Sequence, residues 1–415
     1  MRNERTVIIG GGVIGVCTAH SLARRGRSVV LLERGEIGRG ASFGNAGLIS
    51  VGHLPLPRPG LVLKSLKWMF DKTSPLLIVP RADPALFAWL ARFARACSHS
   101  ALARNMQTIG AMSRATMPLF HRYADEYGVD FEYRRTGYMD VFRTRAAFDH
   151  ACADAEMVGK LGIREEAISG DEALRREPAL LPGVAGAIWR ADAAFGNPHR
   201  FVKGVAESAR ALGAEIRTSV PVDDIEVEKG RVVGVRTSDG ELVEADTVVL
   251  AAGAWSTALA RTARLRVPMQ PAKGYHLMID QLTPTPLTVA CSLGEVFVAA
   301  TPIDGGVRLA GTLELSGLNH AMRQERLDML RPGAAKFLNG VGKAGTGASW
   351  CGLRPCAADG LPVIGWSDKV DGLLVNTAHA MMGFWLAPVS GELAAQMVCG
   401  EEPMVDCEPM RVSRL

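Results

Sequence analysis

The sequence predicts a two-domain α/β protein, in which a mostly parallel sheet is interrupted by an inserted domain built on an antiparallel or mixed β-sheet. The chain has 415 residues, more than the ~250–300 that one core usually serves. Wholly apolar strand candidates stand near both ends, as in a parallel sheet covered on both faces. Between them lies a stretch of different character, punctuated by prolines from Pro55 to Pro84.

The domain boundaries are placed where this pattern changes. Residues 1–54, 183–270 and 346–415 are expected to form the first, discontinuous domain. Residues 55–182 and 271–345 are expected to form the inserted one. The fold class is therefore α/β combined with α+β.

The N-terminal segment has the pattern of one βαβ unit. Val7–Ile9 predicts a buried strand, Ser28–Leu32 predicts a second one, and Val13–Arg25 between them has the spacing of an amphipathic helix. Gly26 follows the helix as a stop signal. Strand, helix and strand in this order indicate the start of a parallel sheet.

Three glycines separate the first strand from the helix. In this position Gly10 permits a tight turn, Gly12 lets the backbone approach a pyrophosphate, and Gly15 lets the helix pack on the strand. The helix N-terminus adds N–H groups and a partial positive charge. Glu33 lies 18 residues beyond Gly15, where a carboxylate accepts the ribose hydroxyls. The unit is Rossmann-like and predicts a bound dinucleotide.

A second glycine-rich loop favours FAD over NAD. The run Gly40–Leu48 consists mainly of small and polar residues. Such a loop brings backbone and hydroxyl donors against a second side of a pyrophosphate, and an NAD dehydrogenase has no evident use for it there.

Further along the chain, apolar and alternating runs predict more elements. Helices are expected over Ala85–Met106, Met112–Tyr127, Arg200–Leu212, Arg323–Asn339 and Pro388–Val398. Strands are expected over Tyr138–Phe142, Ala185–Trp189, Glu215–Thr218, Asp224–Glu228, Val232–Thr237, Asp246–Ala251, Leu361–Gly365 and Leu373–Asn376.

Composition excludes several classes of function. Lys plus Arg number 47 against 43 Asp plus Glu, a balance without the basic excess of a nucleic-acid-binding protein. The eight cysteines are scattered without a CxxC pair, so we expect free thiols and no metal. No signal peptide and no run of ~18 apolar residues occurs. We therefore expect a cytoplasmic enzyme, with contact to the inner face of the cell membrane left open.

At this point the sequence resembles the D-amino-acid dehydrogenase branch of the D-amino-acid oxidase superfamily, nearest to D-proline and hydroxy-D-proline dehydrogenases. The resemblance covers both ends of the chain and is weaker from about residue 55 to residue 185. Its motifs are Val7–Gly15, Gly40–Ser42 with Asn45–Leu48, Val249–Ser256, Pro271–Tyr275, Gly352–Pro355 and Asp359–Pro362.

The resemblance implies which residues hold FAD. They are Gly10, Gly12, Val13, Ile14, Gly15, Glu33 and Arg34; Ala41, Ser42, Asn45, Ala46, Gly47 and Leu48; Val222, Ala252, Gly253 and Trp255; and His379, Ala380, Met381, Met382 and Gly383. The last motif departs from the family, whose histidine usually stands between two glycines. Here Ala378 and Ala380 take those positions. Because an added methyl limits close approach of the backbone, the contact by Ala380 is the less certain one.

The resemblance also implies a reaction. Arg354 would pair with the substrate carboxylate and Tyr275 would orient the substrate, while His53 would reach the same cavity. Hydride would pass from Cα to flavin N5, giving an imine and then a 2-oxo acid. D-Proline or cis-4-hydroxy-D-proline is the expected substrate, and a quinone or another acceptor takes the electrons. Each residue has a structural alternative: a surface ion pair for Arg354, simple packing for Tyr275.

Other readings stay open. Glycine or sarcosine oxidation with oxygen is one, the flavin subunit of a hetero-oligomer is another, and a nucleotide-binding regulatory module is a distant one. FAD is expected to be non-covalent, because neither Cys351 nor Cys356 aligns well with the cysteine of sarcosine oxidase relatives. The basic, apolar stretch Leu61–Phe70 is either a core helix or a membrane-surface segment. Assembly into a homo- or hetero-oligomer is left open.

Overall fold

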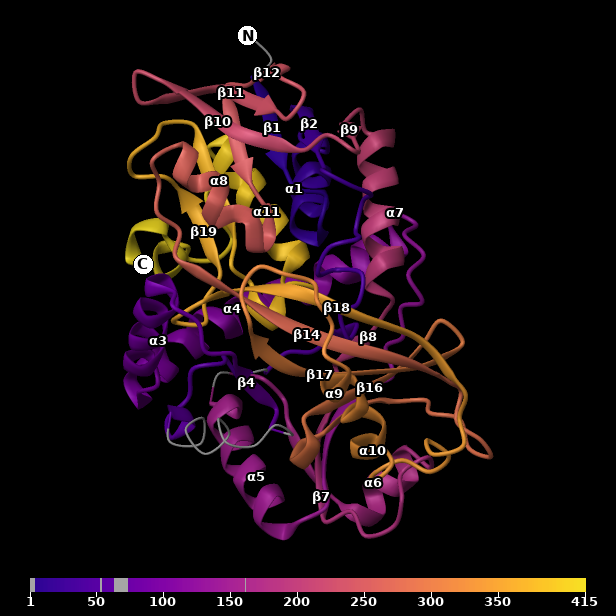
Figure 1. Cartoon of the computed structure of the whole chain (residues 1–415). Helices are drawn as coiled ribbons and strands as arrows, with labels where there is room; N and C mark the ends of the chain where they lie inside the picture. Colours follow the sequence, from indigo (N-terminus) through magenta and orange to yellow (C-terminus); the bar gives the residue numbers. More distant parts are fainter. Residues whose placement is uncertain (1–3, 53, 63–73, 161) are drawn as a thin grey trace.

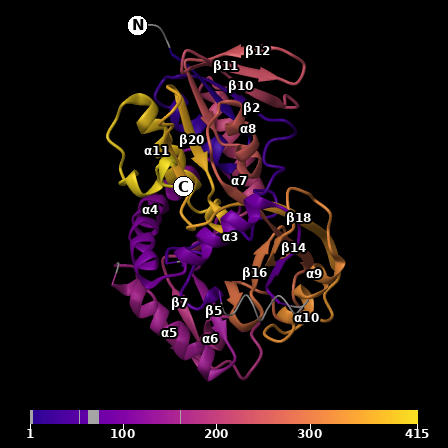
Figure 2. The ribbon, with the colours of Figure 1, turned by 60° about the vertical axis from the view of Figure 1, so that its left-hand side comes forward.

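The computed structural model describes residues 4–52, 54–62, 74–160 and 162–415. Two sheets dominate the fold and lie at opposite ends of the molecule in Figure 1, with the N-terminal strands in the upper half and the second sheet below. Figure 2 shows α5 and α6 at the far end of the lower half. The combination of a mainly parallel nucleotide sheet and a mainly antiparallel second sheet confirms the predicted fold class.

The nucleotide sheet is built around β1 (Arg5–Ile9), which pairs in parallel with β2 (Ser28–Leu32) on one side and β13 (Thr247–Leu250) on the other. Their apolar side chains are buried, as the sequence predicted for central strands. The sheet order is β19-β20-β13-β1-β2-β9, and only β19 is antiparallel to its neighbour. The edge strands are β19 (Val363–Trp366) and β9 (Glu215–Arg217), and β20 (Leu373–Thr377) lies between β19 and β13.

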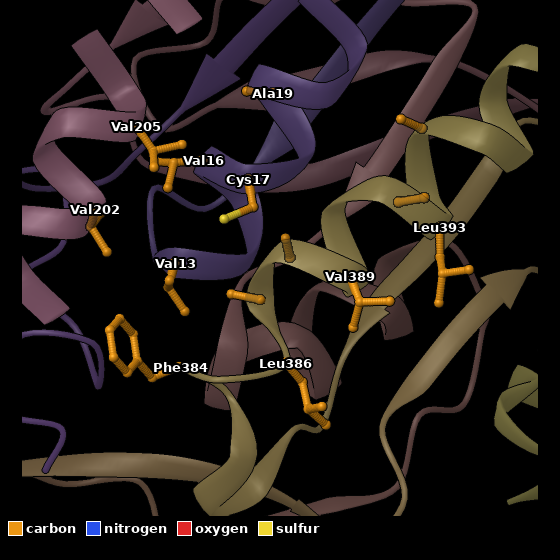
Figure 3. Packing of buried hydrophobic residues seen from close by; sticks show 14 of the residues in the cluster. Val13, Val16, Cys17, Ala19, Val202, Val205, Phe384, Leu386, Val389 and Leu393 are labelled. Carbon is orange, nitrogen blue, oxygen red and sulfur yellow. The ribbon is translucent and has the colours of Figure 1, made fainter. Parts of the chain in front are cut away.

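Three helices cover one face of this sheet: α1 (Val13–Ala23), α7 (Pro198–Ala211) and α11 (Ala387–Cys399). Figure 3 shows Val16 and Cys17 of α1 between side chains of the other two helices. Gly391 of α11 lies so close to α1 that a Cβ atom there would stand 2.5 Å from the Cys17 carbonyl carbon. The contact between α1 and α11 thus depends on a missing side chain.

The rest of the first domain is a small antiparallel sheet with short helical turns. It consists of β10 (Val222–Glu228), β11 (Arg231–Thr237) and β12 (Leu242–Glu244), followed after β13 by the 3-10 turn η1 (Gly253–Trp255) and α8 (Ser256–Thr262). Of these strands, β10 and β11 were expected, with ends that differ by one or two residues, whereas β12 was not predicted.

Within the described residues, the second sheet has nine strands, in the order β18-β14-β17-β16-β15-β5-β7-β6, with β4 pairing β17. Its strands are β4 (Leu76–Ile78), β5 (Tyr138–Phe142), β6 (Glu166–Ser169), β7 (Gly186–Arg190), β14 (Met269–Asp280), β15 (Ala290–Leu293), β16 (Val298–Ile303), β17 (Gly306–Leu315) and β18 (Thr346–Ala357). A two-stranded pair, β3 (Leu48–Ile49) with β8 (Ala194–Phe195), stands apart from both sheets.

Two strands belong to a different sheet than the predicted boundaries imply. β7 lies within residues 183–270 and β18 begins at 346, both assigned from sequence to the first domain, yet both pair in the second sheet. The reason is tertiary: an alternating run has the same pattern whichever sheet it joins. The chain therefore returns to the first domain after β7 and after β18, whereas the predicted boundaries place each return before the strand.

Two helix predictions were wrong in their boundaries. The long helices are α3 (Pro84–Ala96) and α4 (His99–Asp125), and they break at Ser98, whose hydroxyl caps α4 by accepting from the Ala101 N–H. The predicted break near Gly110 does not occur, because that glycine is buried inside α4. The remaining helices of this region are α5 (Arg145–Gly159) and α6 (Gly170–Arg176).

The single helix predicted over Arg323–Asn339 is two short helices, α9 (Gln324–Asp328) and α10 (Leu330–Ala334). A proline ring clashes with the carbonyl four residues earlier, and for Pro332 that residue is Asp328, where α9 ends. Among the described helices, none is long and apolar enough to cross a membrane.

The helix contact at Gly391 generates a stability prediction. Gly391→Ala should lower the free energy of unfolding by ~1–3 kcal/mol, because the new methyl must push α11 away from the Cys17 backbone. Gly159→Ala is the matched control, since a Cβ at that helical glycine meets nothing within 4 Å. Thermal unfolding of both variants measures the difference, and equal melting temperatures would contradict the packing argument.

Candidate active site

A cavity of about 1740 Å³ lies between the two sheets. Ligand pockets in proteins usually have ~300–1,000 Å³, so this one has room for a large cofactor together with a substrate. Its wall runs from Gly12 and Glu33 in the nucleotide domain to Arg354 on β18 of the second sheet. Both halves of the sequence prediction thus meet in one space.

The glycines of the first turn serve the purposes predicted for them. Gly10 has φ +112°, and a Cβ there would lie 2.6 Å from the Ala251 carbonyl oxygen. A Cβ at Gly15 would lie 1.9 Å from the Gly10 carbonyl oxygen, so only glycine lets α1 approach β1. Gly12 is different, because its nearest neighbour would be Ser42 Oγ at 3.6 Å. Its side faces open cavity, where a phosphate could approach the backbone.

Glu33 ends β2 with its carboxylate held in place. Its Oε2 accepts from the Gly11 N–H at 2.7 Å, and its Oε1 accepts from the Gly35 N–H at 2.9 Å. Next to it, the Arg34 guanidinium lies 3.6 Å from the ring centre of Trp255. Two carboxylate oxygens have about four acceptor positions, so Glu33 keeps acceptor capacity for hydroxyl groups in the cavity.

The loop 40–48 is fixed from both domains. Ser42 Oγ accepts from the Val13 N–H of α1 at 3.0 Å. From the second sheet, Arg308 Nη1 donates to the Asn45 carbonyl at 2.8 Å and the His276 ring contacts the Gly44 carbonyl at 3.0 Å. The two domains therefore hold this loop jointly along the cavity wall.

The motif around His379 closes the other side of the cavity. His379 Nε2 lies 2.9 Å from Ser390 Oγ in α11, while Nδ1 is buried and has no hydrogen-bond partner among the described residues. Burial lowers the pKa of His379 to about 3, so the ring is neutral. Ala378 and Ala380 have φ of +66° and +49°. They adopt the left-handed backbone that glycine favours, which explains the glycines of the related motif.

These features fit FAD. Open space at Gly12, N–H groups at the start of α1 and the oriented Glu33 carboxylate are what a dinucleotide needs. The cavity-lining residues that would hold it are Gly10, Gly12, Val13, Ile14, Glu33, Arg34, Ala41, Ser42, Asn45, Ala46, Leu48, Val222, Ala252, Gly253, Trp255, His379, Ala380, Met381 and Gly383.

Three predicted cofactor residues do not line the cavity. Gly15 packs α1 against β1, and Gly47, with φ +79°, lies against the Gly196 carbonyl. Met382 is buried in the core beside α1. These residues therefore contribute to the packing and backbone shape of the segments that line the cavity. His53 lies outside the described residues, as does most of the stretch Leu61–Phe70.

Arg354 is placed on the cavity wall by a local irregularity. Its guanidinium lies across β14, where a Cβ at Gly274 would stand 2.1 Å from it. Nη1 donates to the Thr312 carbonyl at 2.9 Å. A β-bulge opposite Gly274 puts Thr312 at φ +61°, a conformation that is rare for a β-branched residue. Strain of this kind gathers at functional sites.

The Arg354 guanidinium has no carboxylate partner among the residues that the structure describes. Burial lowers its pKa from the ordinary value, although the side chain is partly accessible from the cavity. A half-buried guanidinium with several unused donors is suited to a bidentate carboxylate.

Arg190 shows the contrasting arrangement in the same cavity. It pairs with Asp140 at 2.6 Å and with Glu165 at 2.5 Å, and the Tyr138 hydroxyl donates to Asp140. This arginine is already neutralised within the protein, whereas Arg354 is not.

Tyr275 does not face the cavity. Side chains alternate along β14, so Tyr275 points to the opposite face from Gly274, into the core of the second sheet. Its hydroxyl donates to Glu314 Oε2 at 2.7 Å, and burial together with that carboxylate raises its pKa. The structure does not bring Tyr275 together with Arg354. Tyr275 packs in the core of the second sheet, which was the structural alternative to a role at the substrate.

Sequence reasoning missed several residues that shape the site. Gly274 makes room for Arg354, and Gly44 and Gly352 make room for the Trp350 ring, which their Cβ atoms would approach to 2.1 and 2.0 Å. Arg308 also escaped notice. Gly274 and Gly352 belong to the recognised motifs, although no role was predicted for either of them, and glycine in a strand is a signal of close approach. Arg308 and Trp350 carried no local signal.

Comparison with known proteins agrees with this geometry. The FAD dependent oxidoreductase (DAO) family matches residues 5–397, and the chain belongs to that family. The protein is an FAD-dependent oxidoreductase. The D-amino acid dehydrogenase of Methylobacterium nodulans is 32% identical over 99% of both chains. That of Xylella fastidiosa is 33% identical over 99% of this chain and 93% of the other.

Solved structures share the fold. Glycine oxidase from Geobacillus kaustophilus matches with a TM-score of 0.81 at 24% identity, covering 99% of both chains. L-proline dehydrogenase from P. horikoshii matches with a TM-score of 0.76 at 20% identity, covering 97% of this chain and 95% of the other.

The contact of Arg354 with Gly274 generates a prediction on ligand binding. Gly274→Ala should displace the guanidinium and raise KM for a carboxylate substrate by at least ~10-fold, because a bidentate charge-assisted pair depends on its geometry. FAD content should stay normal. The control is Gly365→Ala, a strand glycine whose Cβ would meet only an ordinary contact at 3.6 Å. An unchanged KM in Gly274→Ala would contradict the placement of Arg354.

The neutral His379 generates a pH prediction. Its pKa is about 3 in the folded protein against 6.5 in a free histidine, so the unfolded chain binds the proton more tightly. Stability should therefore fall as the pH drops from about 6.5 toward about 3, by up to ~1.4 kcal/mol per pH unit for this group. Urea unfolding at pH 7 and pH 5 measures the slope. His379→Gln should show a smaller slope, and the same slope in both proteins would contradict the assignment.

Proposed function

We propose that the protein dehydrogenates a small D-amino acid, with D-proline or cis-4-hydroxy-D-proline as the favoured substrate. The observation that carries the proposal is the Arg354 guanidinium, which has no carboxylate partner among the described residues and lies in the wall of a cavity lined also by the residues proposed to bind FAD. Relatives named D-amino acid dehydrogenase, 32% identical over nearly the whole chain, support the amino-acid substrate and its configuration. The cyclic substrate rests on the resemblance of the motifs alone.

Arg354 would bind the substrate carboxylate through two N–H donors, which fixes direction as well as distance. Its bond to the Thr312 carbonyl would keep the guanidinium from turning with the substrate. FAD supplies the acceptor that takes the hydride from Cα. The amine loses a proton as the imine forms, and for a proline ring the product is a cyclic imine.

His379, which lines the cavity, is a poor general base. Burial lowers the pKa of His379 to about 3, so its ring does not hold a proton readily at neutral pH. We infer that the substrate amine enters the reaction in its neutral form. Positioning, rather than proton abstraction, is then the main contribution of the protein.

We further propose that FAD is held without a covalent bond. All eight cysteines lie in the described part of the chain, and none of them lines the cavity. Burial raises the pKa of Cys351 and raises that of Cys356 to about 12, which keeps both sulfurs protonated. No thioether would therefore join a cysteine to FAD. We propose that the reduced FAD passes its electrons to a quinone or a comparable carrier.

The proposed function predicts flavin bleaching by D-amino acids. Anaerobic titration of the purified FAD-loaded protein should give reduction with D-proline and hydroxylated D-proline, and none with the L-enantiomers. Oxygen uptake measured beside dye reduction separates a dehydrogenase from an oxidase. If no D-amino acid reduces the flavin, the proposal fails.

Arg354→Ala should raise KM by ~10- to 100-fold, because a charge-assisted pair contributes ~1.5–3 kcal/mol. Arg354→Lys should recover only part of the loss, since lysine cannot make the bidentate contact. Arg266→Ala, a change at an exposed arginine, is the control. An unchanged KM in Arg354→Ala would remove this residue from the substrate site.

A further inference from the structure

The loop 316–323 of the second domain reaches the nucleotide domain. It follows β17 and leads into α9. Its His320 stacks on Trp255 of η1, with ring centroids 5.8 Å apart and ring planes at 15°. Both residues line the cavity, on the side where the Arg34 guanidinium also lies over Trp255. A residue of the substrate domain therefore covers the nucleotide end of the FAD site.

The loop is anchored from behind by a buried lysine. Lys273 Nζ donates to Asn319 Oδ1 at 2.8 Å and to the Ala321 carbonyl at 2.7 Å. Its third neighbour is Glu314 Oε1 at 3.4 Å. Lys273 is 1% exposed, so its charge needs these partners. The loop therefore supplies two of the acceptors that the buried Lys273 ammonium needs, which an ordinary surface loop does not do.

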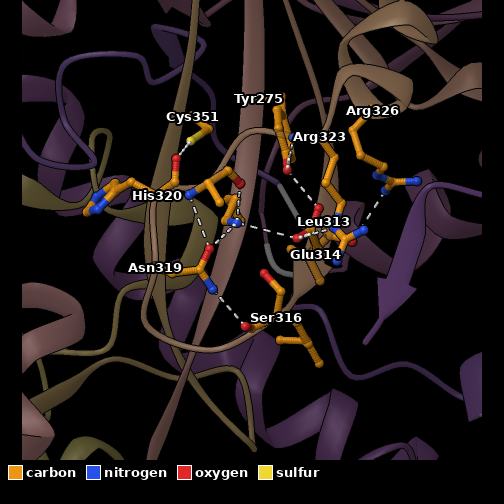
Figure 4. A network of polar contacts seen from close by, with 12 residues as sticks. Tyr275, Leu313, Glu314, Ser316, Asn319, His320, Arg323, Arg326 and Cys351 are labelled. Carbon is orange, nitrogen blue, oxygen red and sulfur yellow. Dashed lines mark hydrogen bonds and ion pairs between the residues drawn. The ribbon is translucent and has the colours of Figure 1, made fainter. Parts of the chain in front are cut away.

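Glu314 fastens the second end of the loop. It is fully buried and accepts from the Tyr275 hydroxyl at 2.7 Å and from Arg323 Nε at 3.3 Å. In the middle, the Cys351 thiol donates to the His320 carbonyl at 3.4 Å. Figure 4 shows these contacts converging on the loop from β14, β17 and β18. Tyr275, expected at the substrate, instead supports this anchor.

The stacking contact lies beside the predicted nucleotide site. Arg34 follows Glu33 at the end of β2, so Trp255 stands beside the predicted ribose and pyrophosphate site. His320 belongs to the opposite domain. Release of a bound dinucleotide from this end would require the His320–Trp255 contact to open.

We propose that loop 316–323 is a clasp over the nucleotide end of the FAD site, and that His320 is a cofactor-retaining residue that slows FAD release. The proposal depends on FAD binding and is independent of which amino acid is oxidised. The ring face of His320 against Trp255 provides the closure, and Lys273 with Asn319 holds the loop in the closed position.

The test measures FAD release from the purified holoprotein, followed by the rise of flavin fluorescence after dilution. His320→Ala should release FAD ~3- to 10-fold faster, the effect of losing one aromatic contact. His320→Phe keeps a ring face and should stay near the original rate. Leu318→Ala, an exposed change in the same loop, is the matched control and should have no effect.

A double-mutant cycle makes the test specific to the contact. His320→Ala and Trp255→Ala should together accelerate release by less than the product of their separate effects, because both remove the same stacking pair. Asn319→Ala should accelerate release by loosening the anchor. An unchanged release rate in His320→Ala, or equal acceleration in His320→Ala and His320→Phe, would overturn the proposal. If no amino acid reduces the flavin, the proposed function fails, but the release rates can still be measured and still test the role of His320.

Discussion

The close approach of α1 to β1 is the constraint on which the rest of the structure depends. Gly15 lacks the side chain that would separate the helix from the Gly10 carbonyl, and Gly10 lacks the one that would meet the Ala251 carbonyl. The N–H groups at the start of α1 then point into the cavity from a fixed position relative to the sheet. Loop 40–48 is bonded to that helix through Ser42, and the second domain grips the same loop from the other side.

Among the described residues, the second sheet contributes both paired and unpaired charges to the cavity wall. Most charges that face the interior are matched, as in the cluster of Arg190 with Asp140 and Glu165. Arg354 in the cavity wall is not matched in this way, since its described partner is only a carbonyl oxygen. An uncompensated buried cation is costly to fold, so it is best understood as a charge whose partner arrives with the ligand. A bulged strand with Thr312 in a strained conformation supports it.

The sequence predicted the nucleotide half of the site far better than the substrate half. The glycines, Glu33 and loop 40–48 are local signals, because a turn must satisfy its steric needs within a few residues. Arg354 was found through its motif. Tyr275 was misplaced because strand alternation decides its direction, and the register of β14 against its neighbours cannot be read from the strand itself. The loop carrying His320 had no signal, since its role arises from a contact between domains.

Strand β14 serves two sites on its two faces. Gly274 supports the guanidinium on the cavity side, while Lys273 and Tyr275 hold the loop on the other side. Neighbouring residues of a strand point in opposite directions, so an insertion or deletion of one residue would exchange the two faces. Evolution can therefore vary the chemistry of either face by substitution, but the length of β14 is fixed. This segment should resist changes of length throughout the lineage of this protein.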